Sequence, residues 1–137
     1  MAVQSLDART LVRQGMLSLA VALAANAALV FVSGVAGIAP DLDPLNYGPV
    51  VLFTSVGVIG ATVVYAALDR LSDSPDRTFA IVAVAVALVS LIPDVVFVPQ
   101  LPGATTLGAV VLGVMHLTTA AACIVFLTDL PGRRAAG

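Results

Sequence analysis

Four polar residues stand within long apolar stretches of the sequence and are the first candidates for chemistry. They are Asn26, Ser90, Asp94 and His116. A polar or ionisable side chain in apolar surroundings is energetically costly, so it generally either joins packed helices or serves a function. We treat these four residues as the candidate polar interior. The chemistry that they could perform depends on which of them lie together.

Asn26 and His116 are each expected about 16 Å along a helix from its entry into an apolar layer, at 1.5 Å per residue. Their segments enter from opposite sides, so both side chains should lie at a similar depth. We therefore expect a hydrogen bond between Asn26 and His116 that fixes the register of two helices. The alternative is a functional histidine that binds a ligand or a metal, or that relays protons near neutral pH.

The sequence gives little support for a metal, a cofactor or catalysis. His116 is the only histidine and Cys123 is the only cysteine. The composition excludes an internal disulfide and a multi-cysteine metal site, and one histidine supplies half of a haem site at most. No nucleophile–base pair is recognisable. We predict no catalytic residues, no metal and no cofactor, and we expect Cys123 to be a small packing residue.

Asp94 directly follows Pro93, which lacks the N–H that would bond to the Val89 carbonyl, so a kink or an early helix end is expected there. One interpretation places Asp94 near a membrane interface, hydrated or bonded to Thr54, Ser55 or a loop N–H. The other combines Asp94 with an outer acidic patch formed by Asp41, Asp43 and Asn46. Oxygen ligands of this kind attract cations and suit a hard divalent ion.

The segments that carry these residues are strongly apolar. Of the 137 residues, 60% are hydrophobic and only 10% are charged, whereas about 25% of the residues of a soluble domain are charged. We therefore predict a single domain over residues 1–137 that is embedded in a membrane and contacts lipids. The net charge of −2 and the scattered arginines argue against nucleic-acid binding. The absence of Glu and Lys is typical of a GC-rich prokaryotic genome.

Four segments reach the length of about 20 apolar residues that a membrane-spanning helix requires. We expect them at residues 15–38, 49–68, 79–98 and 105–127. The connections are short, so successive helices should be antiparallel neighbours in an all-α, up-down four-helix bundle. Small and polar residues at helical spacing should face its interior. They are Gly15, Ala22, Asn26, Ser33, Gly37, Thr54, Gly57, Ala61, Ala83, Ala87, Ser90, Asp94, Ala109, Gly113, His116, Ala120 and Cys123.

All six arginines fall on one side of these spans. They are Arg9, Arg13, Arg70, Arg77, Arg133 and Arg134, and the two opposite loops contain no basic residue. The positive-inside rule then predicts that both termini are cytoplasmic in a multi-pass protein of the cell membrane. A cleaved signal peptide is the competing interpretation of the first span, but its apolar run is longer than the ~7–15 residues of a signal sequence.

The loop at residues 69–78 contains both acids and arginines. We expect a solvated turn with local ion pairs, in which Ser74 or Asp76 caps the following helix. Arg70 and Arg77 could also contact lipid phosphates.

A set of landmarks along the chain is similar to those of a prokaryotic family of uncharacterised four-span membrane proteins. The landmarks are Asp43-Pro-Leu-Asn-Tyr-Gly-Pro49, Asp69-Arg70, Ser74-Pro-Asp-Arg-Thr-Phe79, Ser90-Leu-Ile-Pro-Asp94 and Met115-His116. The resemblance covers most of the chain. It implies a four-helix fold and a membrane location, and it supplies no catalytic residues.

Three classes of function are compatible with these features. The first is a non-enzymatic membrane component that is structural, accessory or self-associating, with a second copy or another membrane protein as its partner. The second is a small transporter or channel with a path lined by Asn26, Ser90, Asp94 and His116. The third is a membrane enzyme or cofactor binder, which lacks a recognisable set of catalytic or ligand residues. We expect the first.

Overall fold

The computed structural model describes residues 6–129. Within them the chain forms four long helices and two short 3₁₀ turns, and no strand occurs in this range. The long helices are α1 (Ala8–Val35), α2 (Tyr47–Leu71), α3 (Pro75–Val96) and α4 (Thr106–Leu127), and the 3₁₀ turns are η1 (Asp43–Leu45) and η2 (Val98–Gln100). All four long helices are long and apolar enough to cross a membrane.

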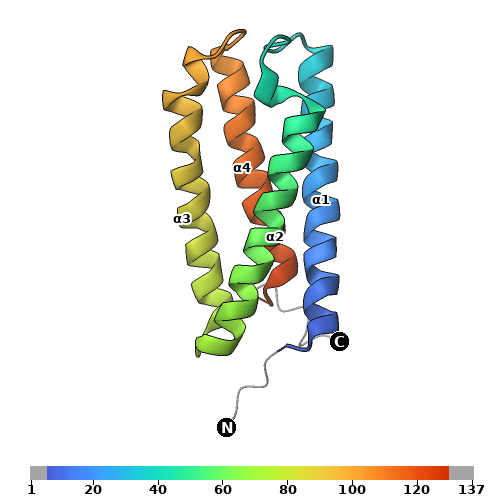
Figure 1. The fold of residues 1–137 in the computed structure, drawn as a ribbon, viewed down its shortest axis with the longest axis vertical. Helices are drawn as coiled ribbons and strands as arrows, with labels where there is room; N and C mark the ends of the chain where they lie inside the picture. The colour runs from blue at the N-terminus through green and yellow to red at the C-terminus, as the bar shows by residue number, and fades with distance from the viewer. Residues whose placement is uncertain (1–5, 130–137) are drawn as a thin grey trace.

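The helices form an up-down bundle, in which α1 begins and α4 ends at the same end (Figure 1). The closing pair α1–α4 packs most extensively, followed by α1–α2 and α3–α4. The pair α2–α3 is the least closely packed of the neighbouring pairs. The predicted all-α fold and the proximity of the first and fourth spans are confirmed, and the loose α2–α3 pair is a feature that the sequence did not indicate.

Helix α1 begins seven residues before the predicted span, because a helix can continue beyond the apolar run. Its first turn is capped by Asp7, whose Oδ1 accepts a hydrogen bond from the Thr10 N–H at 3.1 Å. Hydrogen bonds from the Thr10 hydroxyl and N–H lower the pKa of Asp7, so the carboxylate is charged when it caps the helix. Arg9 and Arg13 therefore lie on the helix itself.

The other end of α1 is a Schellman motif. The Ile38 N–H donates to the Ser33 carbonyl at 2.8 Å, and the Gly37 N–H donates to the Gly34 carbonyl at 3.2 Å. Gly37 has a φ of +67°, the left-handed conformation that this motif requires and that glycine adopts without strain. The helix consequently ends at Val35, before the predicted boundary at Ile38.

Pro93 does not end α3, contrary to one of the two outcomes expected for it. The helix continues to Val96, and the Phe97 N–H donates to the Pro93 carbonyl at 2.8 Å. The chain then passes through η2 to Thr105, whose side chain accepts from the Gly108 N–H at 3.0 Å and caps α4. Asp94 is thus held within the last helical turn rather than in a loop.

The loops between α1 and α2 and between α3 and α4, called outer loops here because the arginine distribution predicts that side, pack against each other and against the start of α4. Gly103 has a φ of +75°, and a Cβ on it would lie 2.5 Å from the backbone of Asp41. A Cβ on Gly108 would lie 2.7 Å from the Cβ of Ala39, which is itself buried. These contacts close the outer end of the bundle over Leu42, which is fully buried.

Only some of the small and polar residues that were predicted to face the interior are buried. Helix α1 buries Ser18, Ala22, Asn26, Val30 and Ser33, which follow one face of the helix. On α2 the buried face carries Val50, Thr54, Val58 and Tyr65, so the prediction that Gly57 lies in the interior is wrong and this glycine is exposed. On α3 and α4, Ala87, Asp94 and Cys123 are buried as predicted.

At the opposite end of the bundle, called the inner end here, Asp76 joins neighbouring helices through hydrogen bonds. Its Oδ1 accepts from the Tyr65 hydroxyl at 2.6 Å and its Oδ2 accepts from the Asp129 N–H at 3.1 Å. The Tyr65 ring packs edge-on against Phe79, with the centroids 5.3 Å apart. Between residues 6 and 129 neither Arg70 nor Arg77 forms a salt bridge, so the predicted local ion pairs are absent there. Ser74 precedes α3 without a side-chain cap bond.

Candidate functional site: a groove between α2 and α3

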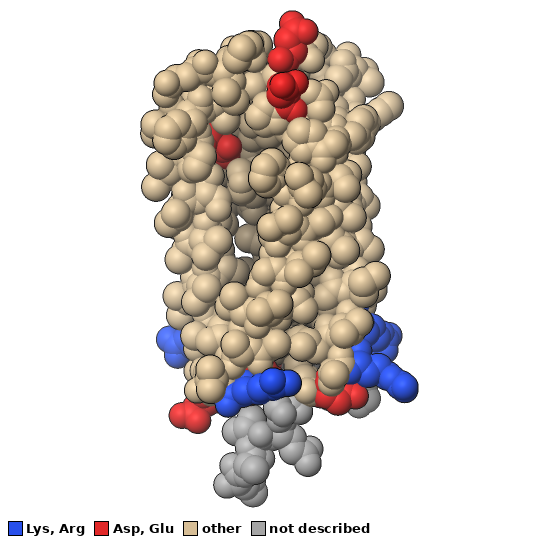
Figure 2. Space-filling view, in the orientation of Figure 1, with Lys and Arg blue, Asp and Glu red and all other residues tan. Residues whose placement is uncertain are grey.

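The loose packing of α2 against α3 leaves a groove of about 600 Å³, with α4 as its floor. Figure 2 shows the hollow on the face between these two helices. Exposed residues of both helices form its rims, among them Phe53, Val56, Gly57 and Val86. The groove is therefore open along the side of the bundle. Its volume lies in the range of ~300–1,000 Å³ that is usual for small-molecule sites.

The groove is largely apolar, but it contains all four residues of the candidate polar interior. Its polar side chains are Asn26, Thr54, Ser90, Asp94, His116 and Thr119. No arginine is among the lining residues. The sequence analysis therefore selected residues that share one cavity, although it missed Thr119. A threonine three positions after His116 is a spacing that places both side chains on one face of the helix.

Asn26 joins three helices. Its Nδ2 donates to Thr54 Oγ1 on α2 and to Thr119 Oγ1 on α4, both at 2.9 Å. The Thr119 hydroxyl in turn donates to the Met115 carbonyl at 2.8 Å. Asn26 is 1% exposed, and its bonds lie at the base of the groove. The residue connects helices as predicted for a bond that fixes their register, but its partners are two threonines instead of His116.

The predicted hydrogen bond between Asn26 and His116 does not form. The Asn26 amide donates to two threonines, and its Oδ1 is buried without a partner among residues 6–129. Similar positions along their helices did not ensure contact, because the side chain of His116 lies against Asp94 on α3. The rotation of each helix about its own axis determines which side chains meet. The apolar periodicity of a sequence defines this rotation only coarsely.

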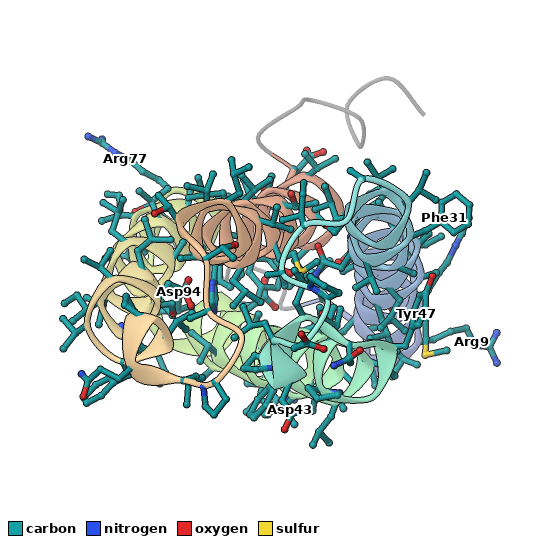
Figure 3. All side chains as sticks on the ribbon, turned by 90° about the horizontal axis from the view of Figure 1, so that it is seen from above. Arg9, Phe31, Asp43, Tyr47, Arg77 and Asp94 are labelled. Carbon is teal, nitrogen blue, oxygen red and sulfur yellow. The ribbon has the colours of Figure 1, made fainter. Side chains whose placement is uncertain are left out.

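His116 lies instead against Asp94. Its Nδ1 is 3.0 Å from Asp94 Oδ2 and also 3.0 Å from the Leu112 carbonyl. The Asp94 side chain is 9% exposed, whereas the His116 side chain is 41% exposed. Figure 3, which looks down on the outer end, shows Asp94 pointing inward from α3. A buried carboxylate and a half-exposed imidazole thus meet at the outer end of the groove.

The Leu112 carbonyl indicates which nitrogen of His116 carries the proton. A carbonyl can only accept, so we assign the hydrogen to Nδ1 and direct it to Leu112. Nε2 of the neutral ring is then an acceptor. The Oδ2 atom of Asp94 is buried without a hydrogen bond, despite its proximity to the ring. With a neutral ring the pair presents acceptors, whereas a protonated ring at this distance forms an ion pair with Asp94.

The partners predicted for Asp94 are wrong. Thr54 bonds to Asn26, and no hydrogen bond joins Asp94 to Thr54, Ser55 or a loop N–H within residues 6–129. Asp94 also lines a second cavity of about 490 Å³ between α3 and α4, bounded by Pro99, Thr105 and Gly113 among others. The carboxylate therefore separates two hollows near the outer end of α3.

Ser90 lies one turn from Asp94 on the same helix and lines the groove, but its hydroxyl donates to the Val86 carbonyl at 2.7 Å. Its hydrogen is thus used within the helix.

The outer acidic patch does not include Asp94. Asp41 and Asp43 are exposed on the first outer loop, and Figure 3 places Asp43 apart from Asp94. The Asn46 amide donates to the carbonyls of Leu42 and Asp43 within its own turn. In the described part of the chain no three histidine, cysteine or acidic residues group as metal ligands. Asp94 is therefore separate from the other predicted cation-binding oxygens.

The sequence of residues 6–133 matches a family described as a family of unknown function, DUF6069. The chain belongs to this family. The match agrees with the resemblance to an uncharacterised family that the landmarks indicated. Comparisons with curated proteins and with solved structures found no significant match. The function must therefore be inferred from the groove and its residues.

Proposed function

We propose that the chain is a four-span protein of the cell membrane with both termini in the cytoplasm. The length and apolar character of the four helices support insertion. The described arginines support the orientation: Arg9, Arg13, Arg70 and Arg77 are exposed at the end where α1 begins, as the blue side chains in Figure 2 show. Basic residues concentrate on the cytoplasmic side of membrane proteins.

The protein in this proposal is a non-enzymatic accessory component that holds a membrane-soluble molecule in the α2–α3 groove. The observation that carries the proposal is the groove itself, which is open along the bundle and mostly apolar, with Asp94 and His116 toward its outer end and Asn26, Thr54 and Thr119 farther along it. In a bilayer such an opening faces lipid chains rather than water. A molecule with an apolar body and one polar group could enter from the side and satisfy both kinds of surface.

A second candidate is association with a transmembrane helix of another copy or of another membrane protein. It is favoured by Gly57 and Gly60, which are exposed on α2 and would have no atom within 4 Å of an added Cβ. Small residues at such spacing allow helices to approach closely in lipid. A helix seated there would occupy the groove in place of a small molecule.

Photolabelling distinguishes these two candidates. The full chain is reconstituted in vesicles with dodecanol that carries a diazirine on its alkyl chain, and labelled residues are mapped by mass spectrometry. We expect labels on the groove residues of α2 and α3, and loss of this labelling in Gly57→Phe. The matched control is Gly34→Phe, because Gly34 is exposed on α1, lies outside the groove and has open space around it.

Uniform labelling of the lipid-facing residues, unchanged by Gly57→Phe, would contradict the small-molecule proposal. If Gly57→Phe instead converts an oligomer that can be cross-linked through α2 into a monomer, the groove holds a helix.

A further inference from the structure

Most of the hydrogen-bond donors along the groove are engaged away from Asp94. The Asn26 amide donates to Thr54 and Thr119, the Thr119 hydroxyl to Met115 and the Ser90 hydroxyl to Val86, whereas the Thr54 hydroxyl accepts from Asn26 and donates no hydrogen bond within residues 6–129. No hydrogen bond reaches the Asp94 carboxylate among residues 6–129, and Nε2 of His116 is an acceptor in the assigned tautomer.

The missing donors indicate what an occupant must supply. A buried acceptor without a donor is costly, and a carboxylate is the most costly kind. The groove lining contains no arginine that could neutralise Asp94, and the half-exposed His116 gives its one N–H to a backbone carbonyl. A positively charged group with several N–H bonds would satisfy both the charge and the acceptors.

We propose that Asp94 and His116 bind the primary ammonium group of a long-chain amine whose alkyl chain lies along the groove. The inference rests on the function proposed above and specifies the chemistry of the molecule that the groove holds. The ammonium group donates to the carboxylate of Asp94, beside the ring of His116. A primary ammonium has three N–H donors, which suits the two oxygens of a carboxylate.

The remainder of the groove fits an alkyl chain. Below Asp94 its walls continue through Ala87, Val86 and Ala83 on α3 and through Gly57 and Gly60 on α2. These residues offer apolar contact, and the polar side chains on the same two walls are Thr54 on α2 and Ser90 on α3. The half-buried Ser90 adds no donor, because its hydrogen is used within α3.

The same contacts disfavour related head groups. A fatty acid or a phosphate would place a second negative charge beside Asp94. A quaternary ammonium carries the positive charge but has no N–H to donate, and an alcohol donates a hydrogen but carries no charge. A metal ion would need more ligands than this pair provides, since no group of three metal-ligating side chains occurs in residues 6–129.

Competition against the dodecanol photoprobe tests the inference on the full chain in detergent at pH 7, where a primary amine is protonated. The competitors are dodecylamine, dodecyltrimethylammonium and unlabelled dodecanol, which share one alkyl chain. We expect dodecylamine to compete at a concentration at least about tenfold lower than either of the other two compounds. A hydrogen bond to a charged group strengthens binding by about that factor.

Asp94→Asn should raise the concentration at which dodecylamine competes with the photoprobe to the concentration at which dodecyltrimethylammonium competes. The matched control is Asp43→Asn, which makes the same chemical change on an exposed acid at the same end of the bundle and outside the groove. Asp43→Asn should leave the preference for the amine unchanged. Retained photolabelling of the groove in Asp94→Asn shows that this variant is folded.

The outcomes separate the two proposals. Groove labelling with equal competition by all three compounds, or an amine preference that survives Asp94→Asn, would overturn the ammonium site and leave the groove function standing. If Asp43→Asn reduced the preference for the amine as much as Asp94→Asn does, the ammonium site would also be overturned. General attraction by the acidic residues of the outer end would then explain binding. Absence of groove labelling by the photoprobe would overturn both proposals.

Discussion

Asn26 and Thr119 lie 93 positions apart in the chain, and the Asn26 amide donates to the Thr119 hydroxyl at 2.9 Å. This bond joins α1 to α4, the most extensively packed pair in the bundle. Hydrogen bonds between transmembrane helices contribute about 0.6–1.7 kcal/mol. We predict that Thr119→Val, which preserves the shape of the side chain, lowers the free energy of unfolding in detergent by that amount.

The adjacent residue provides the control. The Thr118 hydroxyl donates to the Val114 carbonyl of its own helix and contacts no other helix through a hydrogen bond. Thr118→Val should therefore change the unfolding free energy by less than about 0.5 kcal/mol, the range of surface substitutions. Equal effects of the two substitutions would show that the Asn26 bond does not join the helices.

Asp76 holds the inner ends of three helices together. Its two oxygens accept from Tyr65 on α2 and from the Asp129 N–H just beyond α4. Hydrogen bonds to a charged group contribute about 1.5–3 kcal/mol, so Asp76→Ala should reduce the unfolding free energy by at least about 1.5 kcal/mol. Asp73→Ala is the matched control, because Asp73 is exposed in the same loop. Thermal melts of both variants that coincide with the wild type would refute this role.

Gly103 is required by the contact between the two outer loops. An alanine there would combine a φ of +75° with a Cβ 2.5 Å from the Asp41 backbone. We expect Gly103→Ala to reduce the unfolding free energy by about 1–3 kcal/mol, the cost of a strained backbone position. Gly34→Ala, in open space on a helix, should be neutral or stabilising by at most about 1 kcal/mol. Chemical denaturation of both variants measures the difference, and a Gly103→Ala protein as stable as the wild type would contradict the loop contact.

The proposed orientation predicts the labelling of engineered cysteines. Cys123 is buried, so the native thiol should contribute little background. A membrane-impermeant maleimide should label Asp43→Cys in intact cells, because that loop is placed outside. It should label Ser74→Cys only after permeabilisation, since Ser74 lies in the inner loop and is exposed. The reverse pattern would show that the orientation is inverted.

The fold could be predicted because apolar length, loop length and helix-ending residues are all local properties of the sequence. The positions of the helix ends were predicted less accurately. Asp7 extends α1 by capping it ahead of the apolar run, and Gly37 ends it in a motif whose hydrogen bonds depend on backbone conformation. Pro93 is accommodated near the end of α3, where few backbone bonds remain to be lost.

The site could be predicted only as a set of residues. Asn26, Asp94 and His116 were selected because polar groups are costly among apolar residues, and all three line one groove. Their pairing depended on the rotation of each helix, which placed His116 beside Asp94 and gave Asn26 two threonines. The groove itself could not be predicted, since it arises from how loosely α2 and α3 pack.

Native mass spectrometry of protein extracted from its own membrane tests the groove function most directly. We predict that the wild type and Gly34→Phe carry an additional bound molecule of small mass, and that Gly57→Phe has lost it. Equal occupancy in Gly57→Phe and Gly34→Phe would show that the bound molecule lies elsewhere, and a wild-type protein without any bound molecule would contradict the proposal that the groove holds one.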